Sequence, residues 1–312
     1  MNGQAIIMES DTNEPAVIRN TSSGPGNVSW AIEFYNASSV IFRNLIVELE
    51  NDDATGFIAS YNDVDSPPTT IMNNVFYKSI SGVPPQLTFQ GIETYGSTTI
   101  VGNTFKYVGV SHTNSKFISL VGQANASYDV LISSNYAEGN VNYFLNEYDQ
   151  GHPNIYNGYI RNNYVYNNSD SSFQMTTIET QSGLSVTGNV DNHLLPSQFV
   201  SYTGTYSGDH SVLIPGEGSA LRDAGYPESG WDYDIFGTLR HHDVGAGEHI
   251  GDEPVTCWKY TAKYRGSNRS FVMNGGGKYP STLQVPGNVD ISTGRMIDEG
   301  QLIDPSQFNV IQ

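Results

Sequence analysis

The 312-residue chain carries 32 acidic and 14 basic side chains, which gives it a formal net charge of -18. Nucleic acids and anionic membrane surfaces are bound through an excess of Lys and Arg, so this balance excludes both as the main partner. Hydrophobic residues make up 38% of the chain, too many for a disordered protein. No apolar run approaches the roughly 20 residues that a membrane span needs, and membrane insertion is therefore not expected.

The ends of the chain and its one cysteine limit the class of protein further. The first seven residues, MNGQAII, contain neither the basic stretch nor the long apolar core of a secretory signal. This favours a protein used where it is made, such as a virion component, or one whose leader lies upstream of this sequence. The single Cys257 excludes an intramolecular disulfide framework and a cysteine-based zinc site.

Two series of short segments recur along the first 190 residues or so with one shared period. The first is an Ile or Val followed three positions later by Asn, about every 30 residues. Its members are Ile41–Asn44, Ile71–Asn74, Ile100–Asn103, Ile132–Asn135, Ile160–Asn163 and Val186–Asn189. The second series alternates in polarity and ends at a turn residue, as short strands do. Its members are Ile32–Asn36, Ile58–Asn62, Ile92–Gly96, Ile118–Gly122, Leu145–Asp149 and Ile178–Ser182.

A coil of stacked strands explains both series. A unit of about 30 residues cannot bury its own apolar face, whereas six or seven stacked units form parallel sheets around one continuous core. The apolar residue that opens each member of the first series is expected to point inward: Ile41, Ile71, Ile100, Ile132, Ile160 and Val186. The Asn that closes each member tolerates a left-handed backbone, and stacked Asn side chains can form a hydrogen-bonded ladder.

The repeats also resemble a known group of proteins. Residues 39–45, 69–76 and 158–163 look like the repeats of right-handed parallel β-helix proteins, which include pectate-lyase-like enzymes, bacterial surface proteins and phage tailspikes. Ser219–Gly225, with the motifs that follow it up to Glu248, is similar to a segment that often closes the bacterial members. The resemblance implies an all-β fold, a right-handed parallel β-helix of about six to seven coils over residues 1–250, including the closing motif at 219–249. It does not define the chemistry, because this fold hosts lyases, hydrolases, epimerases and adhesins.

A different composition begins after the closing motif. Residues 252–312 hold six of the 14 basic side chains, and Val255–Tyr264 alternates as a strand does. We therefore expect residues 251–312 to form a small C-terminal β appendage that either caps the last coil or docks the protein onto a larger assembly. Since stacked coils leave strand edges open, the expected partners are further copies in a homo-oligomer, or a larger virion or surface assembly.

The second series supplies the candidate site. The residue after an inward Ile points outward, and stacking therefore aligns two outer rows. The first row is Glu33, Ala59, Glu93, Ser119, Asn146 and Glu179, and the second is Tyr35, Tyr61, Tyr95, Val121, Tyr148 and Gln181. The catalytic candidates are Glu33, Glu93 and Glu179, and the ligand-binding candidates are Tyr35, Tyr61, Tyr95 and Tyr148.

Spacing limits what these residues can do. Two coils separate Glu33 from Glu93 by about 9 to 10 Å, at the upper limit for an inverting glycosidase and too far for a retaining one. A shift of one residue in register would bring Glu147 into the row in place of Asn146. The alternative is that these are ordinary solvated side chains, with tyrosines that only stabilise the stack.

Metal sites are weaker hypotheses. Asn51–Asp53 and Asp63–Asp65 supply oxygen ligands of the kind that Ca2+ prefers, but they lack the spaced loop of a calcium site, and turn chemistry explains them better. His241 and His242 could join Asp243, Glu248 and His249 in a zinc cluster. The resemblance instead assigns Asp243 and Glu248 to the closing turns. The sequence therefore predicts no metal site and no cofactor, with Ca2+ as the alternative.

Two classes of function fit these observations. The first is a structural or adhesive β-helix, tailspike-like or another virion or surface protein, that contacts cell-surface or extracellular polysaccharide through its neutral polar and aromatic face. The alternative, favoured by the closing motif, is a secreted polysaccharide lyase or glycoside hydrolase. Either class predicts a location on a virion, on a cell surface or outside the cell.

Overall fold

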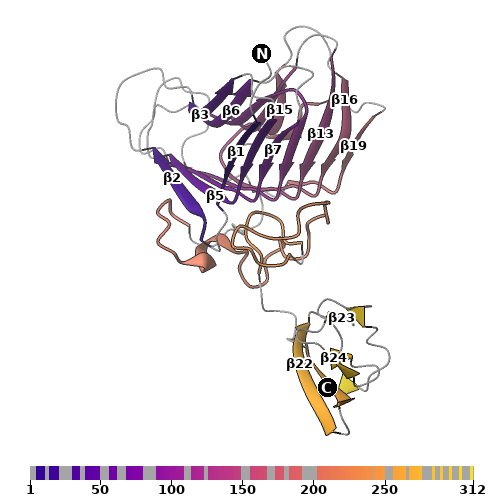
Figure 1. Ribbon diagram of the computed structural model, residues 1–312. Coiled ribbons are helices and arrows are strands. Elements are labelled where there is room, and N and C mark those ends of the chain that lie inside the picture. Colours follow the sequence, from indigo (N-terminus) through magenta and orange to yellow (C-terminus); the bar gives the residue numbers. More distant parts are fainter. Residues whose placement is uncertain are drawn as a thin grey trace. The chain divides into compact units, whose positions relative to one another are not determined.

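The repeated segments form strands in the computed structural model, and these strands line up in three parallel sheets (Figure 1). Sheet 1 consists of β1 (Ala5–Glu9), β4 (Ser39–Arg43), β7 (Thr69–Met72), β10 (Thr98–Val101), β13 (Ser127–Ser133), β16 (Ile155–Arg161) and β19 (Leu184–Thr187). Sheet 2 consists of β2 (Ala16–Asn20), β5 (Leu45–Leu49), β8 (Val75–Ser79), β11 (Thr104–Val108), β14 (Tyr136–Gly139), β17 (Tyr164–Tyr166) and β20 (Val190–Asp191). Sheet 3 consists of β3 (Trp30–Tyr35), β6 (Gly56–Tyr61), β9 (Gln90–Tyr95), β12 (Lys116–Val121), β15 (Tyr143–Tyr148) and β18 (Gln174–Thr176). Each strand pairs with the third strand along the chain, which confirms the predicted parallel β-helix.

The chain divides into two units, Met1–His249 and Ile250–Gln312. In the first unit the structure describes residues 5–10, 14–20, 30–35, 39–49, 56–61, 68–79, 89–108, 114–122, 126–148, 155–166, 173–178, 183–191, 202–240 and 242–249. In the second unit it describes the backbone of seven strands, β21 (Thr256–Tyr264), β22 (Ser267–Gly275), β23 (Leu283–Gln284), β24 (Val289–Asp290), β25 (Arg295–Met296), β26 (Leu302–Ile303) and β27 (Val310–Ile311). Their pairings are all antiparallel, so this unit is a small β structure. No helix in the described residues is long and apolar enough to span a membrane.

The interior of the first unit is a continuous stack of apolar side chains from all three sheets. Ile71, Ile100, Ile132 and Ile160 are fully buried in it, as predicted. The prediction for Ile41 is wrong by one residue, because Phe42 pairs with Ile71 and is buried, while Ile41 pairs with Thr70 on the outer face. Val186 continues the stack in the last coil, where it is partly buried. Each fully buried side chain of this size contributes about 1.5–3 kcal/mol to folding.

The turn between sheets 1 and 2 explains this shift. Its first residue has a left-handed backbone in every described coil from β4 onward, with φ between 52° and 65°. The residues at this position are Asn44, Asn73, Gly102, Ser134, Asn162 and Gly188. The ladder of stacked amides occupies the next position, with the members Asn74, Asn103, Asn135, Asn163 and Asn189. In the first of these turns Asn44 has the left-handed role and Leu45 stands at the ladder position, so the shared Asn does not mark equivalent positions.

Each inner amide of the ladder is fully hydrogen-bonded. The side-chain nitrogen of Asn103 donates to the carbonyl oxygen of Ile71 at 2.9 Å and to the side-chain oxygen of Asn135 at 3.0 Å. Its side-chain oxygen accepts from the backbone and side-chain nitrogens of Asn74 at 2.9 and 3.0 Å. Buried amides are tolerated only when they are paired in this way, and the ladder therefore fixes the vertical register of the coils.

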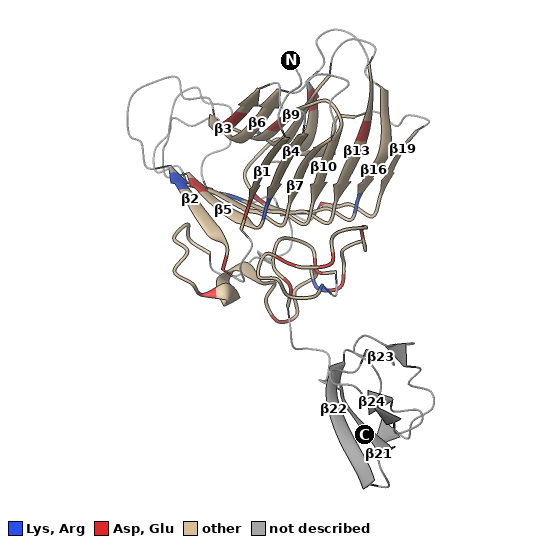
Figure 2. Ribbon diagram, viewed as in Figure 1, with Lys and Arg blue, Asp and Glu red and all other residues tan. Residues whose placement is uncertain are grey.

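Residues 202–249, here the closing segment, cover the outer face of sheet 2 (Figure 1). A short 3-10 turn, His210–Leu213, is the one helical element among the described residues. Apolar side chains of this segment, including Leu213, Leu221 and Ile235, pack on Ile46 and Val75 of the sheet in a second core. Acidic residues recur along the segment and basic ones are few (Figure 2). The outer face of sheet 2 is thus covered along β5, β8 and β14.

The motifs that resemble a closing segment have structural roles. The guanidinium of Arg240 is fully buried against the ring of Trp231, 4.1 Å from its centre. It donates to the side chain of Asn73 at 3.0 Å and to the carbonyls of Gly245 and Ala246, both at 2.8 Å. Asn73 is the left-handed residue of its coil, so this arginine ties the closing segment to the turn between sheets 1 and 2.

Candidate functional site

The outer face of sheet 3 holds the predicted polar row in the predicted register over five strands. Glu33 pairs with Ala59, Ala59 with Glu93, Glu93 with Ser119, and Ser119 with Asn146. Asn146, not Glu147, therefore belongs to the row, and the shift of one residue does not occur. The structure thus brings Glu33 and Glu93 onto one face, two strands apart.

The sixth position of the row differs from the prediction. Leu145 pairs with Thr176, so the residue beside Asn146 is Thr177, whose hydroxyl accepts from the Asn146 side chain at 3.1 Å. Ile178, which was expected to pair with Leu145, lies two residues further on. Glu179 and Gln181 lie outside the described residues, and the row as described therefore runs from Glu33 to Thr177.

Lys116 is a member of this face that the alternation pattern missed. Phe117 and Ile118 are consecutive and both belong to the core, which breaks the alternation of the strand. Lys116 consequently reaches the same outer face as Ser119, and its amine donates to the side chain of Asn146 at 3.3 Å. The pair of adjacent large apolar residues, repeated as Phe57–Ile58 and Phe144–Leu145, was the signal for a bend in the strand.

Glu93 and Lys116 are two oppositely charged side chains of this face that interact with each other. Both side chains are largely withdrawn from solvent. Burial raises the pKa of Glu93, against the opposing effects of the Lys116 charge and of a hydrogen bond from Tyr95. Burial lowers the pKa of Lys116, and the Glu93 charge counteracts it. A carboxyl that holds its proton more readily thus faces an amine that releases its own more readily, the kind of pairing found where acid–base groups are tuned.

The tyrosine row forms a stack beside this pair. The ring centres of Tyr35 and Tyr61 lie 4.8 Å apart with planes 16° from parallel, and Tyr61 and Tyr95 are also 4.8 Å apart but tilted by 48°. Both faces of Tyr61 therefore meet a neighbouring ring, whereas Tyr35 is 62% exposed. Buried Val121 interrupts the row before Tyr148, of which the structure describes the backbone alone.

A close carboxylate pair is not part of this face as described. Glu33 accepts a hydrogen bond from the Tyr35 hydroxyl at 2.7 Å and is exposed, while Glu93 is partly buried. The intervening strand separates the two by two strand spacings, or about 9 to 10 Å. Ala59 and Ser119 of the row are fully buried, so its accessible polar side chains are those of Glu33, Glu93 and Asn146. The face holds one carboxyl with an altered pKa rather than two matched ones.

The candidate metal ligands either accept hydrogen bonds from backbone nitrogens or lie outside the described residues. Asp243 accepts from the backbone nitrogens of Asp223 at 2.8 Å and His249 at 2.7 Å, and Glu248 accepts from the backbone nitrogen of Asp243 at 3.1 Å. These carboxylates hold the closing turns together. His241 and the ranges Asn51–Asp53 and Asp63–Asp65 lie outside the described residues. Within the described ranges, no three His, Cys, Asp or Glu side chains converge as a metal site would require.

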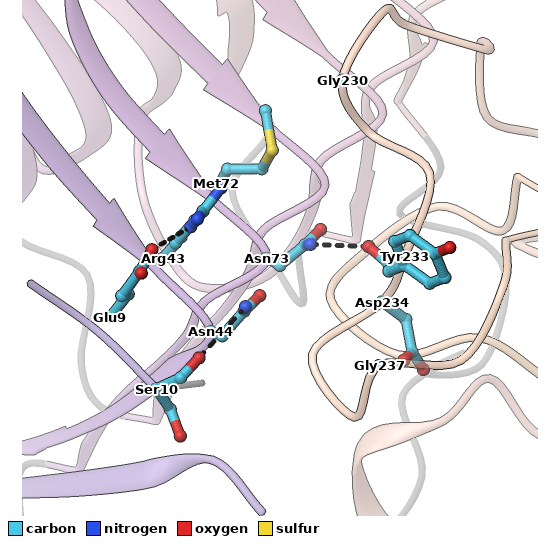
Figure 3. A pocket seen from close by; sticks show the side chains of 10 residues that line it. All are labelled: Glu9, Ser10, Arg43, Asn44, Met72, Asn73, Gly230, Tyr233, Asp234 and Gly237. Atoms are coloured by element: carbon cyan, nitrogen blue, oxygen red, sulfur yellow. Dashed lines mark hydrogen bonds and ion pairs between the residues drawn. The ribbon is translucent and has the colours of Figure 1, made fainter. Parts of the chain in front are cut away.

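A cavity of about 300 Å³ lies elsewhere, between the ends of β1, β4 and β7 and the closing segment. Figure 3 shows Arg43, Asn44 and Asn73 on the side of the coil, and Tyr233 and Asp234 on the side of the closing segment. None of these residues was among the sequence-based candidates. Their closeness depends on the docking of a non-repetitive segment, which periodicity does not describe.

Comparison with known proteins adds no relative. No protein-family model, no curated protein and no solved structure matches the chain. The fold therefore rests on the structure itself, and the function must be argued from the arrangement of these side chains.

Proposed function

We propose that the outer face of sheet 3 binds polysaccharide, and that the protein is a structural or adhesive β-helix of a virion or cell surface. The observation that carries this proposal is the unbroken register of Glu33, Ala59, Glu93, Ser119 and Asn146 beside stacked tyrosines. Polar groups placed beside aromatic rings are typical of ligand sites. The accessible members of the row, Glu33, Glu93 and Asn146, lie on alternate strands, and such a spread suits an extended polymer better than a single small molecule.

The polymer is expected to be neutral. The chain carries a net charge of -18, so it repels polyuronates and other polyanions. Glu33 and Glu93 would accept hydroxyl protons, while the Asn146 amide would donate to ring and hydroxyl oxygens. Because Tyr61 is covered on both faces, a sugar would stack on the exposed ring of Tyr35 and touch the edges of Tyr61 and Tyr95.

The test is retention on a panel of immobilised glycans, scored together with the release of soluble products. The variants are Tyr61→Ala and Glu93→Gln. Tyr159→Ala is a matched control, because Tyr159 is a half-exposed tyrosine on the outer face of sheet 1. We expect both sheet 3 variants to lose retention and the control to keep it. Unchanged retention in both variants would reduce the row to a scaffold that only stabilises the coils.

A polysaccharide lyase or glycoside hydrolase is the second candidate. The opposite pKa shifts of Glu93 and Lys116 favour it, since acid–base catalysis needs groups whose pKa values have moved toward the working pH. The absence of a close carboxylate pair among the described residues of the face favours binding instead. Product release by the wild type that Glu93→Gln abolishes would establish the enzyme.

A further inference from the structure

The outer face of sheet 1 carries a row of uncharged side chains that crosses six consecutive strands. Its members, in order from β1 to β16, are Ile7, Ile41, Thr70, Thr99, Leu131 and Tyr159. Ile7 is 60% exposed and Tyr159 is 46% exposed, and the four residues between them are partly buried. In the part of the chain that the structure describes, neither core contains a member of this row, so the row is open to a partner.

The strands of sheet 1 contain few charged residues (Figure 2). Glu9 and Arg43 pair with each other, and Arg161 pairs with Glu228 of the closing segment at 2.7 Å. Asp129 is the remaining charged residue of these strands. In a chain with a net charge of -18 this face is therefore nearly neutral, and contact with a partner would remove its apolar side chains from water.

Net charge restricts how two copies of the chain can meet. Each copy carries a net charge of -18, so two copies repel each other. The repulsion is smallest where the surfaces in contact add no acidic side chains, because these are then kept furthest apart. The outer face of sheet 1 meets this condition, and it is therefore suited to contact with a second copy.

The order of residues along the row is self-complementary. From either end it runs through two large apolar residues to a threonine at the middle. A twofold axis parallel to the strands, between β7 and β10, places Ile41 opposite Leu131 of the second copy and Thr70 opposite Thr99. The same axis sets Asp129 opposite an uncharged residue, Ser39. An interface in which one patch serves both copies is the commonest kind in homo-oligomers.

The area of the face suits a weak dimer. Sheet 1 has seven strands, and at about 4.8 Å between strands and about 3.3 Å per residue it measures roughly 29 by 16 Å. Two such faces packed about 10 Å apart bury about 1,000 Å² in total, which is the lower limit for a specific interface. Dimers are therefore expected at micromolar concentrations of the protein.

We propose that two copies of the protein pack face to face through the outer faces of sheet 1, about the twofold axis between β7 and β10. Ile41, Thr70, Thr99 and Leu131 form the centre of this contact. Ile7 and Tyr159 lie on its rim, where truncation of one side chain has a small effect. The contact uses neither sheet 3 nor residues 252–312, so it forms whether or not those regions bind partners of their own.

Sedimentation velocity of the full chain over a series of micromolar concentrations tests the proposal, with substitutions of Thr99. We expect the wild type to dimerise reversibly. Thr99→Asp and Thr99→Lys each place a charge at the centre of the contact, so each should raise the dissociation constant at least about tenfold. A loss in both variants identifies the burial of a charge as the cause, because Asp raises the net negative charge of the chain and Lys lowers it.

Two controls make the result specific to sheet 1. Thr99→Val keeps a β-branched side chain of similar shape, so it should dimerise at least as strongly as the wild type. Val108→Asp adds a carboxylate at a 43% exposed position at the end of β11 in sheet 2, so it should dimerise as the wild type does. A wild type that stays monomeric would overturn the proposal, as would equal dissociation constants for the wild type and both charged Thr99 variants.

Salt distinguishes this contact from one between oppositely charged surfaces. Added NaCl screens the repulsion between the two acidic copies, so it should strengthen a dimer held by sheet 1. Dissociation of the dimer as the salt concentration rises would contradict the proposal, because it would show that opposite charges hold the copies together.

Cross-linking tests the symmetry without any change at Thr99. In a Cys257→Ser background, the double variant Ile41→Cys, Leu131→Cys places two thiols opposite each other across the axis. Each single variant places its thiol opposite an unsubstituted residue. A short bismaleimide should therefore link two copies of the double variant and of neither single variant. Linking of a single variant, or no linking of the double variant, would contradict the proposed axis.

Discussion

At the scale of single residues, the two consecutive residues of the turn between sheets 1 and 2 have different roles. The first takes the left-handed backbone, which Asn, Gly and Ser fill in different coils, and the second builds the amide ladder, where every member from Asn74 to Asn189 is Asn. A left-handed backbone tolerates several residue types, whereas a paired buried amide tolerates only its own kind. The sequence predicts the ladder because Asn recurs, yet it cannot separate Asn44 from the ladder, because Asn serves both tasks.

From the hydrogen bonds of the ladder we expect that replacing an inner Asn destabilises the protein much more than replacing the Asn at the end of the ladder. Asn103→Ala removes five hydrogen bonds and deprives buried groups of Asn74 and Ile71 of these partners. We expect the free energy of unfolding to fall by about 3 kcal/mol or more, since each unpaired buried group costs about 1–3 kcal/mol. Urea unfolding followed by circular dichroism measures it.

Asn189→Ala is the control, because Asn189 is the last described amide of the ladder and is partly exposed. Water can reach the groups that it leaves unpaired, so its effect should be less than half that of Asn103→Ala. Equal small losses in both variants would mean that the ladder does not fix the register.

The Glu93 carboxyl gives a second residue-scale prediction, on pH. Its pKa is raised in the folded protein, so between the ordinary carboxyl pKa and the raised value the folded state binds more protons than the unfolded state. Glu93 therefore makes its most favourable contribution to stability below its ordinary pKa, and this contribution is lost as the pH rises through the raised one.

Side-chain NMR titration of wild type and Lys116→Met measures this directly. Lys116 lowers the Glu93 pKa through its charge, so removing that charge should raise the Glu93 pKa further. A Glu93 pKa that stays the same or falls in Lys116→Met would show that the two groups do not interact. Tyr35→Phe, which removes a hydroxyl bound to Glu33, should leave the titration of Glu93 nearly unchanged.

At the scale of elements, regular strands were predictable and their departures from regularity were not. Strict alternation correctly orients Glu33, Glu93 and Asn146, since those strand ends alternate. It fails for Lys116, because the bend at Phe117–Ile118 turns two consecutive side chains into the core. It also says nothing of the cavity beside Asn44, which depends on where a segment without repeats docks.

The docking of that segment depends on Arg240, and this predicts a large effect of its removal. Arg240→Met leaves the buried Glu248 carboxylate without its ion pair and removes one of the two donors to the Asn73 side-chain oxygen. Breaking a buried pair costs about 3–5 kcal/mol, because an uncompensated charge remains inside the protein. Thermal unfolding of the full chain measures the loss.

Arg43→Met is the matched control for Arg240→Met. Arg43 also pairs with a glutamate, but about half of its side chain is exposed. Exposed pairs contribute about 0–1 kcal/mol, so the control should unfold close to the wild type. If the two variants lost equal stability, the closing segment would not depend on the buried arginine.

At the scale of the whole molecule, the chain combines a continuous core with strand edges that no described strand covers. β1 and β19 end sheet 1, and β3 and β18 end sheet 3. Open edges invite pairing with other strands, so proteins cover or block them. We therefore expect a homo-oligomer or a larger virion or surface assembly, with residues 252–312 at the contact.

Deletion of residues 252–312 tests this expectation. Sedimentation equilibrium should give a smaller assembly, or a loss of solubility, for the shortened chain than for the full one. The division of the chain after His249 makes this a clean cut between units. Unchanged assembly and unchanged solubility would count against a docking role for the second unit.

The measurement that most directly tests the binding of polysaccharide by sheet 3 is the dissociation constant for the best-retained neutral polysaccharide, determined for the wild type and for the double variant Tyr61→Ala, Glu93→Gln. If sheet 3 binds the polymer, we expect the double variant to bind at least about tenfold more weakly, a difference of about 1.4 kcal/mol. Tyr159→Ala should bind as the wild type does. Equal affinities of the wild type and the double variant would contradict the binding of polysaccharide by sheet 3.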